Sequence, residues 1–175
     1  MSKQVYIASA ARTPVGSFQG ALSSLSAPEL GAHSIRASIE SASVQDSQID
    51  EVIMGNVVSA GLKQAPARQA MRNAGLPDSC GATTVNKVCG SGMKAIMLAT
   101  DLIKADSGTT IIAGGMESMS NAPYLVQKAR SGLRMGHQQM QDALFLDGLE
   151  DAETGGSMGS FAQNTADEFQ LTRKD

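Results

Sequence analysis

The fold is decided by one stretch of the chain, Thr83-Thr84-Val85-Asn86-Lys87-Val88-Cys89-Gly90-Ser91-Gly92-Met93-Lys94-Ala95-Ile96. Its β-branched beginning favours a strand, and the glycine-rich turn that follows opens a helix. A thiol at a helix N-terminus faces unpaired backbone N–H groups and the positive end of the helix dipole, and both favour the thiolate. Cys89 is therefore a candidate covalent nucleophile, with Gly90 and Gly92 leaving room for an acyl group. The alternative interpretation is a small cysteine buried at a strand end.

Strands and helices alternate on both sides of this stretch. The apolar run from Gln4 to Ala10 favours a central strand, because it is apolar on both faces. The capping-box pattern that begins at Ser26 predicts a helix that ends near Ser41, and the helix after Cys89 is expected to be deeply buried and to end at Lys104. Further strands are predicted over 51–58, 83–88 and 109–113, and further helices over 66–74 and 160–169. This alternation is typical of a layered α/β sheet.

The composition excludes several classes of function. The 175 residues suffice for one core, and a net charge of −3 gives no reason to expect nucleic-acid binding. No apolar run is long enough to cross a bilayer, and the N-terminus lacks the layout of a signal peptide. Cys80 and Cys89 are not spaced as a metal site. We therefore expect a cytoplasmic protein without a metal, a nucleic-acid partner or a membrane span, in which a nucleophilic cysteine stays reduced.

Four separated segments of the chain carry a resemblance to known proteins. They are Ala11-Arg12-Thr13-Pro14-Val15-Gly16, Met54-Gly55-Asn56-Val57 with the following Gln64 to Gln69, the nucleophile segment Val85 to Ala95, and Ala113-Gly114-Gly115-Met116-Glu117-Ser118-Met119-Ser120. In this order they resemble segments of the thiolases, the acetyl-CoA acetyltransferase family. Four matches in order are far more specific than one motif. The resemblance implies a layered α/β/α core, of which this chain is the first and incomplete half.

The resemblance also implies a division of the chain. Residues 1–118 are expected to form the N-terminal core without its last strand, and 119–175 to begin a loop domain that covers the active site and helps subunits associate. Because thiolases are roughly twice as long, we interpret the chain as an N-terminal fragment, a truncated product or one piece of a cut protein. The full-length protein is expected to be a homodimer or homotetramer.

The chemistry that the resemblance implies is a Claisen condensation of two acetyl-CoA to acetoacetyl-CoA, or the reverse thiolysis. Cys89 would take the acyl group, coenzyme A thioesters would be substrates, and no permanently bound cofactor is expected. A second base must then remove an α-proton, and in the family the bases come from the other half. His33 on a helix surface and His137 in a loop are poor candidates, so this chain alone is expected to be inactive.

Three residues match family positions that line the coenzyme A channel. They are Leu149, Ser157 and Met158. Ser157 departs from one common pattern, because many biosynthetic thiolases carry histidine there, which leaves the substrate preference open. The alternative interpretation of these positions is ordinary packing of a loop.

Two other functions compete with the acetyltransferase. A degradative 3-ketoacyl-CoA thiolase of broader chain length is the close alternative, although such enzymes usually carry serine where this chain has Gly90. A non-catalytic fragment with a structural or binding role is the alternative from a different class, and the missing base favours it for this chain alone.

Overall fold

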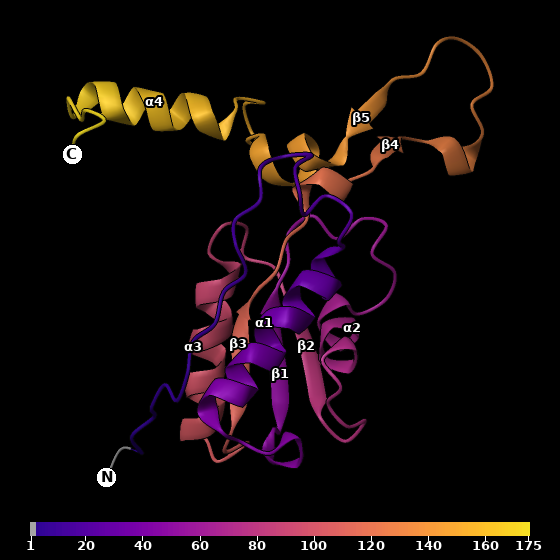
Figure 1. The fold of residues 1–175 in the computed structure, drawn as a ribbon. Coiled ribbons are helices and arrows are strands. Elements are labelled where there is room, and N and C mark those ends of the chain that lie inside the picture. The colour runs from indigo at the N-terminus through magenta and orange to yellow at the C-terminus, as the bar shows by residue number, and fades with distance from the viewer. Residues whose placement is uncertain (1–2) are drawn as a thin grey trace. The chain divides into compact units, whose positions relative to one another are not determined.

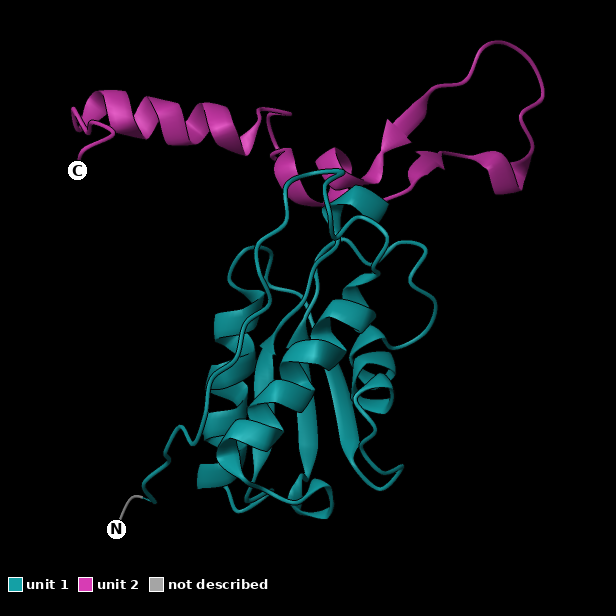
Figure 2. Cartoon of the chain, viewed as in Figure 1, with its two compact units in different colours: residues 1–121 teal, residues 122–175 magenta. Residues whose placement is uncertain are grey.

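The computed structural model describes residues 3–175, and the chain divides into two compact units, Met1–Asn121 and Ala122–Asp175. Figure 2 distinguishes the two units by colour. The boundary falls three residues after the predicted one at 118. Among residues 3–175, no helix is both long and apolar enough to cross a membrane.

A three-stranded parallel sheet lies at the centre of the first unit. The strand β1 (Glu51–Gly55) pairs on one side with β2 (Gly81–Val85) and on the other with β3 (Ile111–Gly115). In this register Ile53 lies opposite Thr83 and Ala113. The expected layered α/β fold with a parallel sheet is confirmed (Figure 1).

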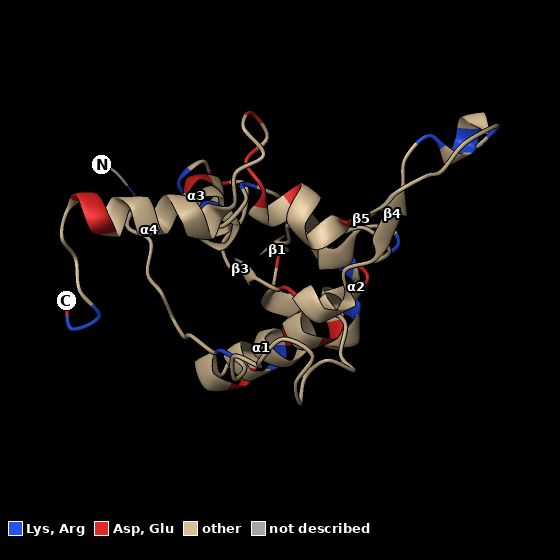
Figure 3. Cartoon of the chain, turned by 90° about the horizontal axis from the view of Figure 1, so that it is seen from above, with Lys and Arg blue, Asp and Glu red and all other residues tan. Residues whose placement is uncertain are grey.

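Side chains of β1 alternate between two helical layers. Val52 and Met54 belong to a core cluster with the helices α1 (Ala27–Ala42) and α2 (Pro66–Asn73), whereas Ile53 belongs to a cluster with α3 (Ser91–Lys104). Figure 3, seen from above, shows α3 on one side of the sheet and α1 and α2 on the other. Because successive strand residues point to opposite faces, a strand covered on both faces is apolar throughout, as β1 is from Val52 to Met54.

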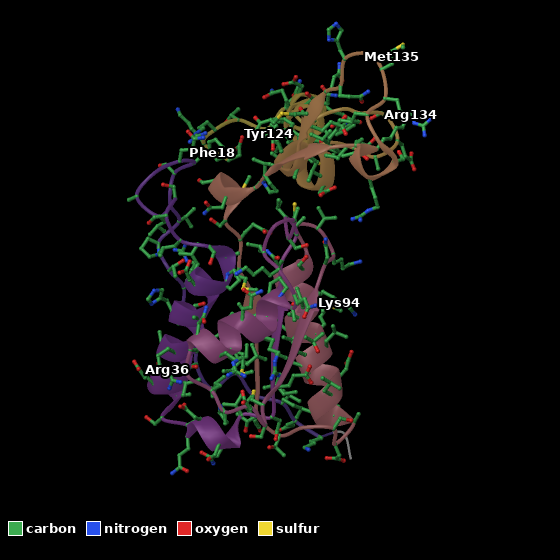
Figure 4. The ribbon with its side chains drawn as sticks, turned by 90° about the vertical axis from the view of Figure 1, so that its right-hand side faces the viewer. Phe18, Arg36, Lys94, Tyr124, Arg134 and Met135 are labelled. Atoms are coloured by element: carbon green, nitrogen blue, oxygen red, sulfur yellow. The ribbon has the colours of Figure 1, made fainter. Side chains whose placement is uncertain are left out.

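Helix α1 begins with the capping box that its sequence predicts. The Glu29 carboxylate accepts hydrogen bonds from the backbone N–H and the hydroxyl of Ser26, both at 2.7 Å. These hydrogen bonds lower the pKa of Glu29. Arg36, labelled in Figure 4, donates to Asp46 at 2.8 Å and to the carbonyl of Ala74 at 2.9 Å, and so ties α1 to the end of α2.

The prediction of a central strand from Gln4 to Ala10 is wrong. This segment forms no strand, and Tyr6 and Ile7 are 79% and 82% exposed. The centre of the sheet is β1, whose two edges are already paired with β2 and β3. A strand is defined by its hydrogen-bonded neighbour, and an apolar run does not say which neighbour it has.

The prediction that the helix after Cys89 is deeply buried is also wrong. Helix α3 packs on the sheet through Ala95 and Ala99, while Met93, Ile96 and Met97 are 72%, 47% and 53% exposed. Residues four apart lie on the same helix face. Two alanines on that face let the helix approach the sheet closely, so the larger apolar side chains point the other way.

The second unit contains a short antiparallel pair and two helical segments. Strand β4 (Tyr124–Val126) pairs with β5 (Met140–Asp142). A π-helical turn, Phe145–Leu149, and the helix α4 (Met158–Glu168) follow. Single 3₁₀ turns complete the described structure at Asp46–Gln48 and Met119–Asn121 in the first unit and at Ala129–Ser131 in the second. That this unit is the beginning of a loop domain stays a prediction.

Candidate active site

The segments that follow the three parallel strands meet at the end of the sheet where the carboxyl ends of the strands lie. After β1, the backbone N–H of Asn56 donates to the carbonyl of Val85 at 3.0 Å. The Asn56 side-chain amide donates to the carbonyl of Met116, after β3, at 3.2 Å. The carboxyl edge of a parallel sheet is where ligands bind in open α/β folds. Three of the four thiolase-like segments therefore converge at the edge where chemistry is expected.

The fourth segment, near the N-terminus, reaches the same edge. A cavity of about 140 Å³ in the first unit is lined by Arg12 and Thr13 from that segment and by Met116 and Glu117 after β3. All four segments of the resemblance thus lie at or beside the carboxyl end of the sheet.

The two thiols of the chain occupy opposite environments. Cys80 is 2% exposed before β2, and its burial raises the pKa of the thiol, which disfavours the reactive thiolate. Cys89 is exposed and directly precedes Gly90, the N-cap of α3. The predicted placement of Cys89 between a strand and a helix is what the structure has. Its role as nucleophile stays a prediction.

The turn that carries Cys89 has an unusual backbone. Val88 has φ = 47°, in the left-handed region that β-branched residues rarely adopt. The backbone N–H of Val88 donates to the Asn86 side chain at 2.9 Å. The hydroxyl of Ser91, a residue only 4% exposed, accepts from the N–H of Lys87 at 2.8 Å and donates to the carbonyl of Val88 at 2.6 Å.

The first turn of α3 lies directly against the end of β1. A Cβ added at Gly55 would lie 2.6 Å from the Cβ of Ser91 and 2.8 Å from the backbone nitrogen of Gly92. Both distances are shorter than real Cβ contacts. The absence of a side chain at Gly55 therefore sets how closely the helix that follows Cys89 approaches the sheet.

A half-buried carboxylate holds the segment after β1. Glu117 accepts hydrogen bonds from the backbone N–H groups of Val57 at 2.9 Å and Val58 at 3.1 Å, and from the side-chain amide of Asn56 at 2.7 Å. Burial raises the pKa of Glu117, and the two backbone hydrogen bonds oppose that shift only in part.

Replacing Glu117 by glutamine should destabilise the protein in a pH-dependent way. At neutral pH the loss of one acceptor oxygen should cost about 1 kcal/mol. Folding raises the pKa of Glu117 above its ordinary value of 4.5. Between those two values the native state binds more protons than the unfolded chain, so stability falls as pH rises. The advantage of wild type over variant should thus shrink as pH rises above 4.5.

Urea unfolding of both proteins at each pH measures that difference. Glu153→Gln is the matched control, because Glu153 is exposed in the second unit, and it should leave the stability unchanged. A wild-type advantage that is constant with pH would contradict the assignment to Glu117.

Both histidines among residues 3–175 have exposed side chains. His33 is exposed on α1, and His137 is exposed in the loop between β4 and β5. Among residues 3–175 there is no group of three or more His, Cys, Asp or Glu side chains that could hold a metal ion.

The three predicted coenzyme A positions lie close together within the second unit. Leu149 ends the π-helical turn, and an isolated antiparallel bridge pairs the next residue, Glu150, with Ser157. Ser157 caps α4, since its hydroxyl accepts from the backbone N–H of Ser160 at 3.2 Å, and Met158 begins that helix and is exposed. π-Helical turns frequently occur at functional sites. The structure thus groups these residues, and their contact with a ligand stays a prediction.

Sequence reasoning missed the side chains that shape the Cys89 turn. Ser91 stands out in the sequence only as part of the glycine-rich turn after Cys89, and Glu117 only as part of a resemblance. Asn86 carried a usable signal, because asparagine side chains accept hydrogen bonds from the backbone two residues on. No sequence pattern indicated the left-handed Val88.

Comparison with known proteins gives the chain its relatives. Residues 5–175 match the family model of the thiolase N-terminal domain. The chain is 51% identical to an acetyl-CoA acetyltransferase of Escherichia coli, over 98% of this chain and 44% of that protein. It is 49% identical to acetyl-CoA acetyltransferase 2 of Arabidopsis thaliana, over 98% of this chain and 43% of that one.

A solved structure extends the likeness to three dimensions. A thiolase of Ascaris suum, crystallised in complex with coenzyme A, is 42% identical and superimposes with a TM-score of 0.91. The match covers 98% of this chain and 44% of that structure. The chain therefore spans less than half the length of the relatives that it matches.

Proposed function

This chain belongs to the thiolase family, and we propose on that basis that the full-length protein is an acetyl-CoA C-acetyltransferase with Cys89 as its nucleophile. The substrates are two molecules of acetyl-CoA, or acetoacetyl-CoA and coenzyme A in the reverse direction. The observation that carries the proposal is the exposed thiol at the N-terminus of α3, at the sheet edge where all four thiolase-like segments meet.

The first half of the reaction is acyl transfer to the thiol. The Cys89 thiolate attacks the thioester carbonyl, a new carbon–sulfur bond forms, and coenzyme A leaves as its thiolate after the tetrahedral intermediate collapses. The oxyanion of that intermediate needs N–H donors, and the backbone N–H of Cys89 is the donor that this chain supplies.

The second half needs a base that this chain does not provide at the turn. A base removes an α-proton from the second acetyl-CoA, and the resulting carbanion attacks the acetyl-cysteine, which releases the thiolate and forms acetoacetyl-CoA. We assign this base to the part of the full-length protein outside the chain, and we expect the 175-residue chain alone to be inactive.

We assign the pantetheine arm of coenzyme A to Leu149, Ser157 and Met158. Support comes from the bridge that holds these residues together and from the exposure of Met158. A thioether and an aliphatic side chain suit the mixed apolar surface of such a ligand.

The decisive experiment is thiolysis of acetoacetyl-CoA by free coenzyme A, followed at the enolate absorbance. The full-length protein should turn over, and the 175-residue chain should not. In the same assay Met158→Ala should raise KM for the thioester with little change in kcat. Turnover by the short chain near the full-length rate would mean that His33 or His137 is catalytic. An unchanged KM would remove Met158 from the channel.

The same assay separates the acetyltransferase from its alternatives. A degradative thiolase of broader chain length would cleave longer 3-ketoacyl-CoA substrates at least as well as acetoacetyl-CoA. A non-catalytic protein would cleave none of them. Gly90 favours the biosynthetic branch.

A further inference from the structure

We propose that Ser91 is a positioning residue whose hydroxyl holds Val88 in its left-handed conformation and thereby fixes Cys89 at the N-terminus of α3. The inference rests on the proposed role of Cys89 as nucleophile. It assigns a function to a hydroxyl that belongs to the nucleophile turn and takes no part in the bond-making steps.

The turn needs such a restraint because its backbone is strained at Val88. A φ of 47° brings Cβ close to the carbonyl oxygen, and two γ-methyl groups aggravate the crowding. Left alone, a valine returns to negative φ. Strained backbone conformations persist only where the surrounding structure over-determines them.

The Ser91 hydroxyl forms hydrogen bonds with backbone groups of Val88 and of the residue before it. It accepts from the N–H of Lys87, one residue before Val88, at 2.8 Å, and donates to the carbonyl of Val88 at 2.6 Å. Ser91 is 4% exposed, so water cannot easily take the place of either partner. The backbone N–H of Ser91 also donates to the Val88 carbonyl, at 3.0 Å. An alanine at position 91 would keep this backbone hydrogen bond to Val88 and would leave the N–H of Lys87 without its acceptor.

The position of Ser91 is itself fixed by the sheet. The close approach of its Cβ to Gly55 leaves the side chain no room to move toward β1. A hydroxyl held on a rigid helix start can fix the flexible turn before it. Cys89, between the strained residue and the helix, is then presented in one orientation.

The test is acetylation of Cys89 by acetyl-CoA in the full-length protein, located by mass spectrometry of the peptide that contains residue 89. Ser91→Ala should slow acetylation by about tenfold or more, because the turn relaxes and the thiol leaves its attacking position. Thr100→Val is the matched control. It removes a hydroxyl that donates to the carbonyl of Ile96 at 2.9 Å on the same helix α3, and it should leave the rate unchanged.

Rescue separates positioning from simple packing. Glycine adopts positive φ without penalty, so the double variant Val88→Gly/Ser91→Ala should regain most of the lost rate. If Ser91 only filled space, glycine at position 88 would restore nothing. A second measurement needs no activity: Val88→Gly should unfold at a higher temperature than Val88→Ala, which reverses the usual order of these residues.

Each outcome decides the matter. The proposal is wrong if Ser91→Ala is acetylated at the normal rate. It is also wrong if the double variant is no faster or no better folded than Ser91→Ala, or if Val88→Ala is as stable as Val88→Gly. Failure of wild-type Cys89 to accept an acetyl group would instead overturn the proposed function. Slow acetylation in Ser91→Ala with recovery in the double variant supports both.

Discussion

Replacing Cys89 by serine should abolish acyl transfer from acetyl-CoA in the full-length protein. The serine hydroxyl is far less acidic than a thiol, so the helix N-terminus that favours a thiolate cannot ionise it, and turnover should fall by more than about 10³-fold. Rapid mixing with acetyl-labelled acetyl-CoA should show a burst of protein-bound label in the wild type and none in the variant.

The other thiol of the chain provides the control. Cys80→Ala removes a buried thiol that lies in the core, so it should lower stability while leaving the burst intact. Label retained at the normal rate on another residue of Cys89→Ser would disprove the assignment of the nucleophile.

Replacing Gly55 by alanine should have the largest effect on stability. The added Cβ would lie within 2.8 Å of three atoms of Ser91 and Gly92, two of which are backbone atoms that cannot move without the helix. We expect the free energy of unfolding to fall by about 3 kcal/mol. Because α3 must shift, acetylation of Cys89 should also slow. Chemical denaturation and the labelling burst measure the two effects.

Gly114→Ala is the matched substitution on the neighbouring strand. Its added Cβ would lie no closer than 3.7 Å to the Met54 sulfur, an ordinary contact. It should cost less than about 1 kcal/mol. Equal losses in the two variants would show that the close approach at Gly55 does not govern the packing of α3.

Elements whose signals are local could be predicted from the sequence. The capping pattern at Ser26 and the apolar stripe of Ile35 and Ile39 predict α1 from residues that lie only three or four positions apart in the sequence. The structure buries both isoleucines. The strand before Cys89 could be predicted for the same reason, because the β-branched run and the glycines lie next to one another, although β2 ends at Val85 and not at the predicted Val88.

Features set by distant neighbours could not be predicted. The apolar segment from Gln4 to Ala10 reads as a strand, yet pairing depends on which edge is free. The exposure of Met93 and Met97 follows from the choice of Ala95 and Ala99 as the face toward the sheet. Either face would satisfy the same periodicity.

The candidate site shows the same limit at the scale of single atoms. The resemblance indicated Cys89. The hydrogen bond between Glu117 and Val57, by contrast, joins residues about 60 positions apart, and the restraint by Ser91 depends on one dihedral angle at Val88. Sequence patterns report residue types and their spacing, and they report neither a distant contact nor a dihedral angle.

The parallel pairing of β1 has a consequence for synthesis on the ribosome. Glu51 pairs with Ile111, so the middle strand of the sheet is made well before its second neighbour. At ordinary elongation speeds, about 5–20 residues per second, β1 waits roughly 3–12 s for β3. During that wait the backbone edge of β1 that later pairs with β3 has no partner strand. An unpaired strand edge can pair with another chain, so the middle strand of the finished sheet is open to misassembly along one edge until β3 is made.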